Sequence, residues 1–130
     1  MTNLKYRYYG DKFVKRKKYS NRSCKCWNKD HAPHGSILEA AYCNELSLLK
    51  KSGAIADYET QFKIVCDVNG RHVCNHYVDF LVTNNDGTKE FHETKGFDQD
   101  VWKLKRKLVE ALYPDIPYIV KREKQKWRKF

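Results

Sequence analysis

Two turn sequences divide the middle of the chain into extended segments. Asn69-Gly70 is typical of a two-residue β-hairpin turn, and it separates residues 58–68 from residues 72–82, both of which are rich in strand-forming residues. A second turn sequence, Asn84-Asn85-Asp86-Gly87, leads into another such segment at residues 88–94. The sequence therefore predicts a three-stranded antiparallel meander, and this fixes the direction of each strand relative to the next.

A helix is predicted on each side of this meander in the sequence. Ser36 is a good N-cap for a helix that ends near Gly53, and a second helix follows Asp98 or Asp100 and ends before Pro114. The predicted apolar stripes are Leu38, Ala41, Tyr42, Leu46 and Leu49 in the first helix, and Val101, Leu104, Leu108 and Leu112 in the second. With a last short strand at residues 116–120, the order α-β-β-β-α-β predicts an α/β fold.

Charge is concentrated at both ends of the chain. The net charge is +10, which favours a polyanionic partner, and nucleic acid is the first candidate. Residues 1–34 interleave basic and aromatic residues without a sustained apolar period, and residues 123–130 are a basic tail, so residues 35–122 are predicted to be the folded core. In the arm, DNA contact is expected from Lys15, Arg16, Lys17 and Lys18, although such a segment is also typical of a solvated tail.

The chain shows no sequence feature of membrane insertion or export. No apolar stretch approaches the roughly 20 residues that span a bilayer, and residues 1–10 lack the hydrophobic region of a secretory signal. We therefore expect no membrane partner and a cytoplasmic location.

The second predicted hairpin brings two acidic residues together. If its strands pair regularly about Asp86, then Asp79 lies opposite Glu93, and Lys95 points to the same face as Glu93. Two carboxylates beside a lysine on strands flanked by apolar residues are costly to bury, and Mg²⁺ would relieve that cost. A surface hairpin with solvated acids and an ordinary salt bridge is the alternative.

Five short motifs carry a resemblance to a known family. In chain order they are Ser36-Ile-Leu-Glu39, Tyr58-Glu-Thr-Gln61, Tyr77-Val-Asp79-Phe80, Glu93-Thr-Lys95-Gly96 and Leu104-Lys-Arg-Lys-Leu108. With this order and spacing, residues 35–120 resemble the PD-(D/E)XK nuclease superfamily, and more closely its small phage-type members akin to enzymes that resolve branched DNA and Holliday junctions. The proline of the superfamily's name is absent, since Val78 precedes Asp79. The resemblance implies a restriction-endonuclease-like core with a mixed sheet flanked by helices.

The same resemblance implies roles for individual residues. Asp79 and Glu93 would be ligands of Mg²⁺, for which Mn²⁺ can substitute, and the Thr94 carbonyl would add another ligand. Lys95 would orient the attacking water and stabilise charge at the phosphate. The family pattern also places an acid on the first helix, here Glu39, in a metal-binding or water-positioning role. Ser36-x-x-Glu39 is equally a capping box, in which Glu39 bonds back to the N-cap amide, so both interpretations stay open.

Two further matches to the family concern the first strand and the second helix. Gln61 matches a glutamine of the family's site, but regular pairing about Asn69-Gly70 places it opposite Val78, so an active-site role requires a β-bulge. Without the bulge, Gln61 is a structural polar residue. A basic cluster on the second helix, which either contacts DNA or is an ordinary exposed face, consists of Lys105, Arg106 and Lys107.

A cluster of cysteine and histidine precedes the first helix. The chain has five cysteines and no export signal, so reduced thiols are expected rather than disulfides. A zinc site is one interpretation of Cys24, Cys26, His31 and His34, although their spacing is not that of a standard zinc finger. Unliganded side chains are the alternative, and His34 would then lie near the active site.

These features predict a Mg²⁺-dependent DNA endonuclease that hydrolyses phosphodiester bonds. The resemblance implies branched or junction DNA as the substrate, and a homodimer, since small resolving enzymes work as symmetric dimers. The alternative is a non-catalytic nucleic-acid-binding protein with a zinc-stapled N-terminal segment.

Overall fold

The computed structural model describes residues 6–9, 12–15, 23–96 and 98–122, and for the first two of these ranges it describes the backbone only. The elements in chain order are β1 (Tyr6–Tyr9), β2 (Lys12–Lys15), α1 (Ile37–Lys51), β3 (Asp57–Val68), β4 (Arg71–Thr83), β5 (Lys89–Lys95), α2 (Asp100–Leu112) and β6 (Tyr118–Arg122). From α1 onward this order is the predicted α-β-β-β-α-β.

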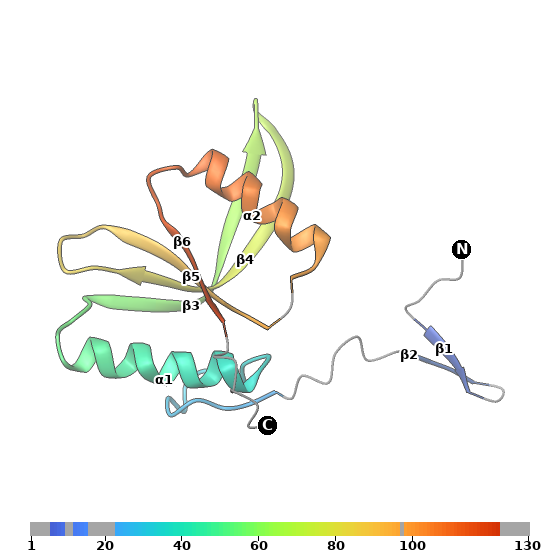
Figure 1. The fold of residues 1–130 in the computed structure, drawn as a ribbon, viewed down its shortest axis with the longest axis horizontal. Coiled ribbons are helices and arrows are strands. Elements are labelled where there is room, and N and C mark those ends of the chain that lie inside the picture. Colours follow the sequence, from blue (N-terminus) through green and yellow to red (C-terminus); the bar gives the residue numbers. More distant parts are fainter. Residues whose placement is uncertain (1–5, 10–11, 16–22, 97, 123–130) are drawn as a thin grey trace, which may run out of the picture.

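The core is a four-stranded mixed sheet in the order β3-β4-β5-β6 (Figure 1). β3, β4 and β5 form the predicted antiparallel meander, and β6 pairs with β5 in parallel. Every β4–β5 pair, from Thr83 with Lys89 to Phe80 with His92, is equidistant from Asp86, which is the predicted register. The α/β class with a sheet between two helices is therefore confirmed.

One register shift separates the two halves of the β3–β4 hairpin. Next to the turn, Asp67 pairs with His72, but the following pair is Cys66 with Cys74, so Val73 is an extra residue on β4. This β-bulge moves the rest of β3 by one residue relative to regular pairing. The flanking pairs Thr60–Phe80 and Phe62–Val78 consequently put Gln61 opposite Asp79.

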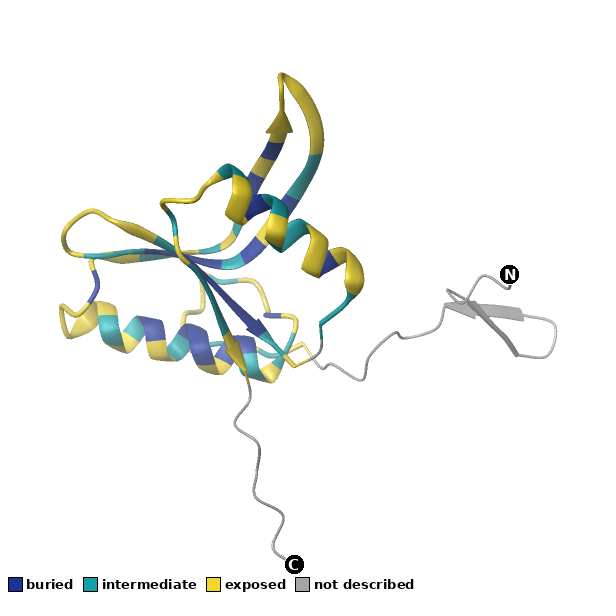
Figure 2. Cartoon of the chain, turned by 45° about the horizontal axis from the view of Figure 1, so that its top comes forward, coloured by how far each residue is buried: buried dark blue, intermediate teal, exposed yellow. Residues whose placement is uncertain are grey.

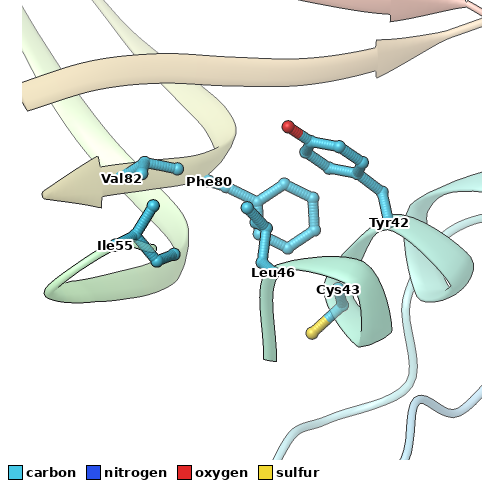
Figure 3. Close-up of a cluster of buried hydrophobic side chains, with 6 residues drawn as sticks. All are labelled: Tyr42, Cys43, Leu46, Ile55, Phe80 and Val82. Carbon is cyan, nitrogen blue, oxygen red and sulfur yellow. The ribbon is translucent and has the colours of Figure 1, made fainter. Parts of the chain in front are cut away.

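Two apolar clusters hold the helices against the sheet. Figure 3 shows the first cluster, in which side chains of α1 pack with Ile55 and with Phe80 and Val82 of β4. In the second cluster, Val109 of α2 packs against a different set of sheet residues, which includes Val78 and Leu81. Val78 and Phe80 are two residues apart on β4 but belong to different clusters, so the alternation of its side chains between the two helices changes at Asp79.

Burial follows this layered arrangement. Figure 2 shows that the central parts of the sheet are buried, while the tip of the β3–β4 hairpin is exposed. α1 lies along one side of the sheet and α2 crosses the other (Figure 1). Asp79 thus lies between Val78, which packs in the cluster of α2, and Phe80, which packs in the cluster of α1.

The predicted apolar stripe of α2 is wrong at its N-terminal end. Val101 is 64% exposed and Leu104 is 69% exposed, whereas Trp102 and Val109 are buried. Gln99 occupies the N-cap position without a side-chain capping bond. Neither predicted cap is used. Asp98 instead forms a bidentate ion pair with Arg122, with both N–O distances 2.8 Å, and Asp100 is the first residue of the helix itself.

The ends of the chain differ from the sequence-based division in two respects. β1 and β2 pair as an antiparallel hairpin, which the lack of apolar periodicity in the arm does not predict. Residues 23–34, assigned to the arm, pack on the core, where the Trp27 amide donates to Asn44 Oδ1 of α1 at 2.8 Å. The basic tail at residues 123–130 lies outside the described residues. Within the described part, neither helix is long and apolar enough to cross a membrane.

Candidate functional site

Four elements bring polar side chains together around Asp79. Glu39 comes from the first turn of α1, Gln61 from β3, Asp79 from β4, and Glu93 and Lys95 from the end of β5. Gln61 contacts Asp79 directly, and the charges of Glu39 and Glu93 act on it. Lys95 contacts Glu93 rather than Asp79. The structure therefore brings together the residues for which the sequence predicts chemistry.

Asp79 is held by the backbone and side chain of Thr94. Its Oδ2 accepts from the Thr94 amide at 2.9 Å and from the Thr94 hydroxyl at 3.0 Å, while Gln61 Nε2 lies 3.4 Å from Oδ1. Burial, followed by the negative charge of Glu39, raises the pKa of Asp79 to about 6, although the Thr94 bonds oppose this shift. Asp79 is thus a carboxylate that gains from a nearby cation.

Glu93 is only 4% exposed, and several donors surround it. The Tyr118 hydroxyl donates to its Oε2, His76 Nε2 lies 3.7 Å from the same oxygen, and Lys95 Nζ lies 3.7 Å from Oε1. Burial alone would raise the pKa of Glu93, but His76, Tyr118 and Lys95 outweigh it, so the pKa lies below its usual range. Glu93 is therefore ionised near neutral pH while the neighbouring Asp79 holds its proton more tightly.

Lys95 is kept at the site by an aromatic surface. Its Nζ lies 4.9 Å from the centroid of the Trp102 ring, and Arg106 lies 5.8 Å from the same ring and 5.3 Å from that of Tyr118. Cations placed over aromatic faces gain electrostatic stabilisation. Lys95 therefore lies beside the Glu93 carboxylate, and Arg106 of α2 shares the aromatic surface that holds it.

Glu39 faces the site and makes half of the expected capping box. Ser36 is the N-cap, and its hydroxyl accepts from the Glu39 amide at 3.1 Å. The Glu39 side chain does not bond the Ser36 amide in return: Oε2 accepts from the Gly35 amide at 3.3 Å, and Oε1 accepts from Gln61 Nε2 at 2.8 Å and contacts His34 Nδ1 at 3.0 Å. Capping and site roles thus belong to different groups of the same residue, the amide and the carboxylate.

Gln61 links two of the acids. The bulge at Val73 brings it opposite Asp79, and its amide nitrogen lies between Glu39 Oε1 and Asp79 Oδ1. Its φ of 50° is in the left-handed region, which is costly for a residue with a side chain and is concentrated at functional sites. The bulge that an active-site position of Gln61 requires is therefore present.

The donor set suits a hard divalent cation in part. Mg²⁺ takes oxygen ligands, typically one or two protein carboxylates together with water and substrate phosphate. In the part of the chain that the structure describes, Asp79 Oδ1 has only the long contact to Gln61, and Glu93 Oε1 faces Lys95. Among the described residues the three carboxylates do not form a group as compact as the Cys and His cluster described below. The carboxylate oxygens that these contacts leave for a cation are Asp79 Oδ1 and Glu93 Oε1.

The basic cluster on α2 has intramolecular partners for two of its three members. Lys105 Nζ donates to the Asn75 carbonyl at 3.2 Å, and Arg106 Nε donates to Glu110 at 2.7 Å, while Lys107 is exposed. In the arm, Arg16, Lys17 and Lys18 lie outside the described residues, and only the backbone of Lys15 is described.

A second polar cluster lies next to Glu39, between α1 and the segment that precedes it. The ligand atoms of Cys26, His31, His34 and Cys43 all lie within 4.8 Å of one another, so this group could hold a metal ion. The predicted set is wrong in one member: Cys43 of α1 takes the place of Cys24. Cys24 instead forms a backbone bridge with His34, with N–O distances of 3.0 and 2.8 Å.

Three residues that complete these clusters are not predicted from the sequence. His76 and Tyr118 surround Glu93, and Cys43 completes the sulfur and nitrogen cluster. The spacing of Cys43 does carry a signal, because it lies four residues after Glu39 and so on the same face of α1. His76 and Tyr118 carry none, since their approach depends on how β6 is placed beside β5.

Comparisons with known proteins give one match. A family model described as "Protein of unknown function (DUF1064)" matches residues 16–127, which is most of the chain. A search of curated proteins and a search of solved structures each found no match.

Proposed function

The chain belongs to the DUF1064 family, and we propose that it is a Mg²⁺-dependent DNA endonuclease that hydrolyses phosphodiester bonds at Asp79, Glu93 and Lys95. The element order from α1 to β6 and the motifs on it support a restriction-endonuclease-like core. Glu39 and Gln61 complete the proposed active site.

The convergence of Glu39, Asp79 and Glu93 carries this proposal. Two of these carboxylates, Glu39 and Glu93, are themselves among the causes that raise the pKa of Asp79. Repulsion among three neighbouring carboxylates lowers the stability of the folded protein, and a bound divalent cation restores that stability. Functional sites are where such perturbed groups concentrate.

Each residue of the proposed site has a distinct role. Thr94 fixes the Asp79 carboxylate through Oδ2, so Asp79 Oδ1 and Glu93 Oε1 would hold the ion. Lys95, held over Trp102, places a positive charge where the phosphate gains negative charge, and it orients the attacking water. Mg²⁺, when bound, supplies Lewis acidity that offsets the charge developing on the phosphate. Gln61 keeps Glu39 and Asp79 at a fixed separation.

The substrate and assembly state follow from the family resemblance and the charge. A net charge of +10 suits a DNA backbone, with contacts from Lys107, Arg106 and Lys105 of α2 and from Lys15–Lys18 of the arm. Branched or four-way-junction DNA is the proposed substrate, and a homodimer would place two such sites on its two strands.

Cleavage of defined DNA substrates tests the proposal. Purified protein is incubated with plasmid, single-stranded and four-way-junction DNA in Mg²⁺ or Mn²⁺. Asp79→Asn, Glu93→Gln and Lys95→Ala should each lower the cleavage rate by at least about 10²-fold while DNA binding is retained. Intact DNA in every substrate and both metals contradicts the proposal.

Matched variants exclude contaminating nucleases and nonspecific charge effects. Glu59 is an exposed acid on β3 and Lys89 is an exposed lysine at the other end of β5. Glu59→Gln and Lys89→Ala should therefore cleave at the wild-type rate. If they fall with the site variants, the activity does not arise from this site.

The compact Cys and His cluster favours a second candidate function. A non-catalytic nucleic-acid-binding protein would use the same basic surface and a metal-stapled N-terminal segment without turnover. Both candidates predict salt-sensitive DNA binding. They differ in that the binding protein leaves all substrates intact and binds them equally well with or without Mg²⁺.

A further inference from the structure

The cluster of Cys26, His31, His34 and Cys43 has the dimensions of a tetrahedral metal site. His31 Nδ1 lies 3.4 Å from Cys26 Sγ and 3.4 Å from Cys43 Sγ. Zn–S bonds of about 2.3 Å and Zn–N bonds of about 2.0–2.1 Å at tetrahedral angles place a sulfur and a nitrogen about 3.5 Å apart. The two sulfur–nitrogen pairs of His31 thus have the separation expected around one zinc ion, and the ligand atoms of all four residues lie within 4.8 Å of one another.

One ring nitrogen of His34 is free to bind a metal in this cluster. The residue is 4% exposed, and its Nδ1 contacts Glu39 Oε1 at 3.0 Å. Its Nε2 is buried and has no hydrogen-bond partner among the described residues. Donation from Nδ1 to a carboxylate leaves the Nε2 lone pair available, which is the form of histidine that binds a metal.

Local structure brings the four ligands together from two segments. The backbone bridge between Cys24 and His34 closes the loop that carries Cys26, His31 and His34. Cys43 lies in the second turn of α1, and Figure 3 shows its sulfur pointing away from the Tyr42 and Phe80 rings. A metal ion bound by all four side chains would therefore join this loop to α1 through Cys43.

Groups around the cluster suit bound ligands. Tyr58 Oη lies 3.6 Å from Cys43 Sγ, so its hydroxyl can donate to a thiolate.

We propose that Cys26, His31, His34 and Cys43 bind one structural Zn²⁺, and that His34 transmits this fixed position to Glu39. Two sulfur and two imidazole ligands in a closed, partly buried set are typical of structural zinc. Zn²⁺ replaces the protons of two thiols, which pass to solvent, so the charge of the protein interior is unchanged.

The link to Glu39 has a physical basis in the arrangement of carboxylate, histidine and metal. Glu39 and Cys43 are four residues apart on α1, so the helix holds one ligand and the carboxylate that orients another. Glu39 Oε1 also accepts from Gln61, which reaches Asp79. The consequence for the acidic site rests on the proposed function, whereas the zinc site itself does not.

Zinc content is the direct test. The full chain is produced in zinc-containing medium, and metal is measured by mass spectrometry together with zinc release by a thiol reagent. One equivalent of zinc per chain is expected in wild type, with loss in Cys26→Ser and Cys43→Ser. Cys24→Ser is the matched control and should keep its zinc, because the Cys24 thiol lies outside the cluster and contacts the Lys25 carbonyl at 3.6 Å.

Wild-type protein that holds no zinc, and takes up neither Zn²⁺ nor the spectroscopic probe Co²⁺ after reduction, overturns the site. Retention of full zinc by Cys43→Ser overturns the ligand set. Circular dichroism checks that reduced Cys26→Ser is folded. A folded Cys26→Ser that keeps its zinc also overturns the ligand set.

Mn²⁺ affinity tests the link to Glu39. Electron paramagnetic resonance should show that zinc-free Cys26→Ser binds Mn²⁺ at the acidic site at least about tenfold more weakly than wild type or Cys24→Ser. Equal affinity overturns the link and leaves the zinc site standing. A zinc-loaded wild type that binds Mn²⁺ but cuts no DNA contradicts the proposed function alone.

Discussion

Asp79 is the residue whose ionisation opposes folding most directly. Its pKa is about 6 in the folded chain against about 3.9 when unfolded, so the folded state binds the proton more tightly. Stability of the metal-free protein should therefore fall as pH rises from 4 to 6, and stay low above pH 6. Asp79→Asn should be more stable than wild type at pH 8, by at most about 3 kcal/mol.

Urea unfolding in the presence of a chelator, at pH 5 and pH 8, measures this difference. The advantage of Asp79→Asn should shrink at pH 5, and added Mg²⁺ should stabilise wild type at pH 8 but not the variant. Asp115→Asn changes an exposed aspartate after α2 and is the matched control. A variant that is less stable than wild type at pH 8 would contradict the repulsion among the three acids.

At the residue scale, the sequence predicts the acidic pair but not its surroundings. The register from Thr83–Lys89 to Phe80–His92 follows from one turn and can be computed from residue numbers, but it ends one pair before Asp79, which accepts from Thr94. The position of Gln61 opposite Asp79 depends on the bulge at Val73, and no turn sequence predicts that bulge. Cys43 is missed because it lies on a helix, away from the other ligands in the sequence.

At the scale of elements, the start of α1 carries both a cap and a site residue. Ser36→Ala removes the hydroxyl that accepts from the Glu39 amide, and should destabilise the protein by about 1 kcal/mol. Ser36→Asp should restore that stability, since aspartate caps as well as serine. Thermal unfolding measures both variants, and equal destabilisation by the two would show that the cap is not the cause.

The two faces of α2 give a second contrast in stability. Val109→Ala removes two buried methyl groups and should cost about 2 kcal/mol, whereas Leu104→Ser on the exposed face should change stability by less than about 0.5 kcal/mol. Chemical denaturation of both variants checks this. A larger loss from Leu104→Ser would support the apolar stripe that the sequence predicts.

The error in that stripe has a physical cause. Two overlapping helical stripes share Leu108 and Leu112, and they differ in whether Val101 with Leu104 or Trp102 with Val109 is turned inward. An aromatic side chain buries more apolar area than a valine, so Trp102 prevails. Strand boundaries in the core are more predictable: β3, β4 and β5 lie within one residue of their predicted bounds, and only the last strand moves further, from residues 116–120 to Tyr118–Arg122.

At the scale of the whole molecule, excess positive charge is the property that the sequence reports most directly. Residues 123–130 contain four lysine or arginine residues and one glutamate. Each phosphate that such residues neutralise releases counterions and adds about 0.9 to the slope of log affinity against log salt concentration for duplex DNA. The tail can thus contribute to DNA affinity without contributing to sequence preference.

Replacing Lys124, Lys126, Arg128 and Lys129 together by glutamine tests this contribution. The magnitude of the salt slope should fall by about 0.9 for each phosphate that the wild-type tail neutralises, and affinity at low salt should fall on every DNA substrate alike. Fluorescence anisotropy over a salt series measures both quantities. An unchanged slope would assign phosphate binding to other basic groups, such as exposed Lys107 on α2.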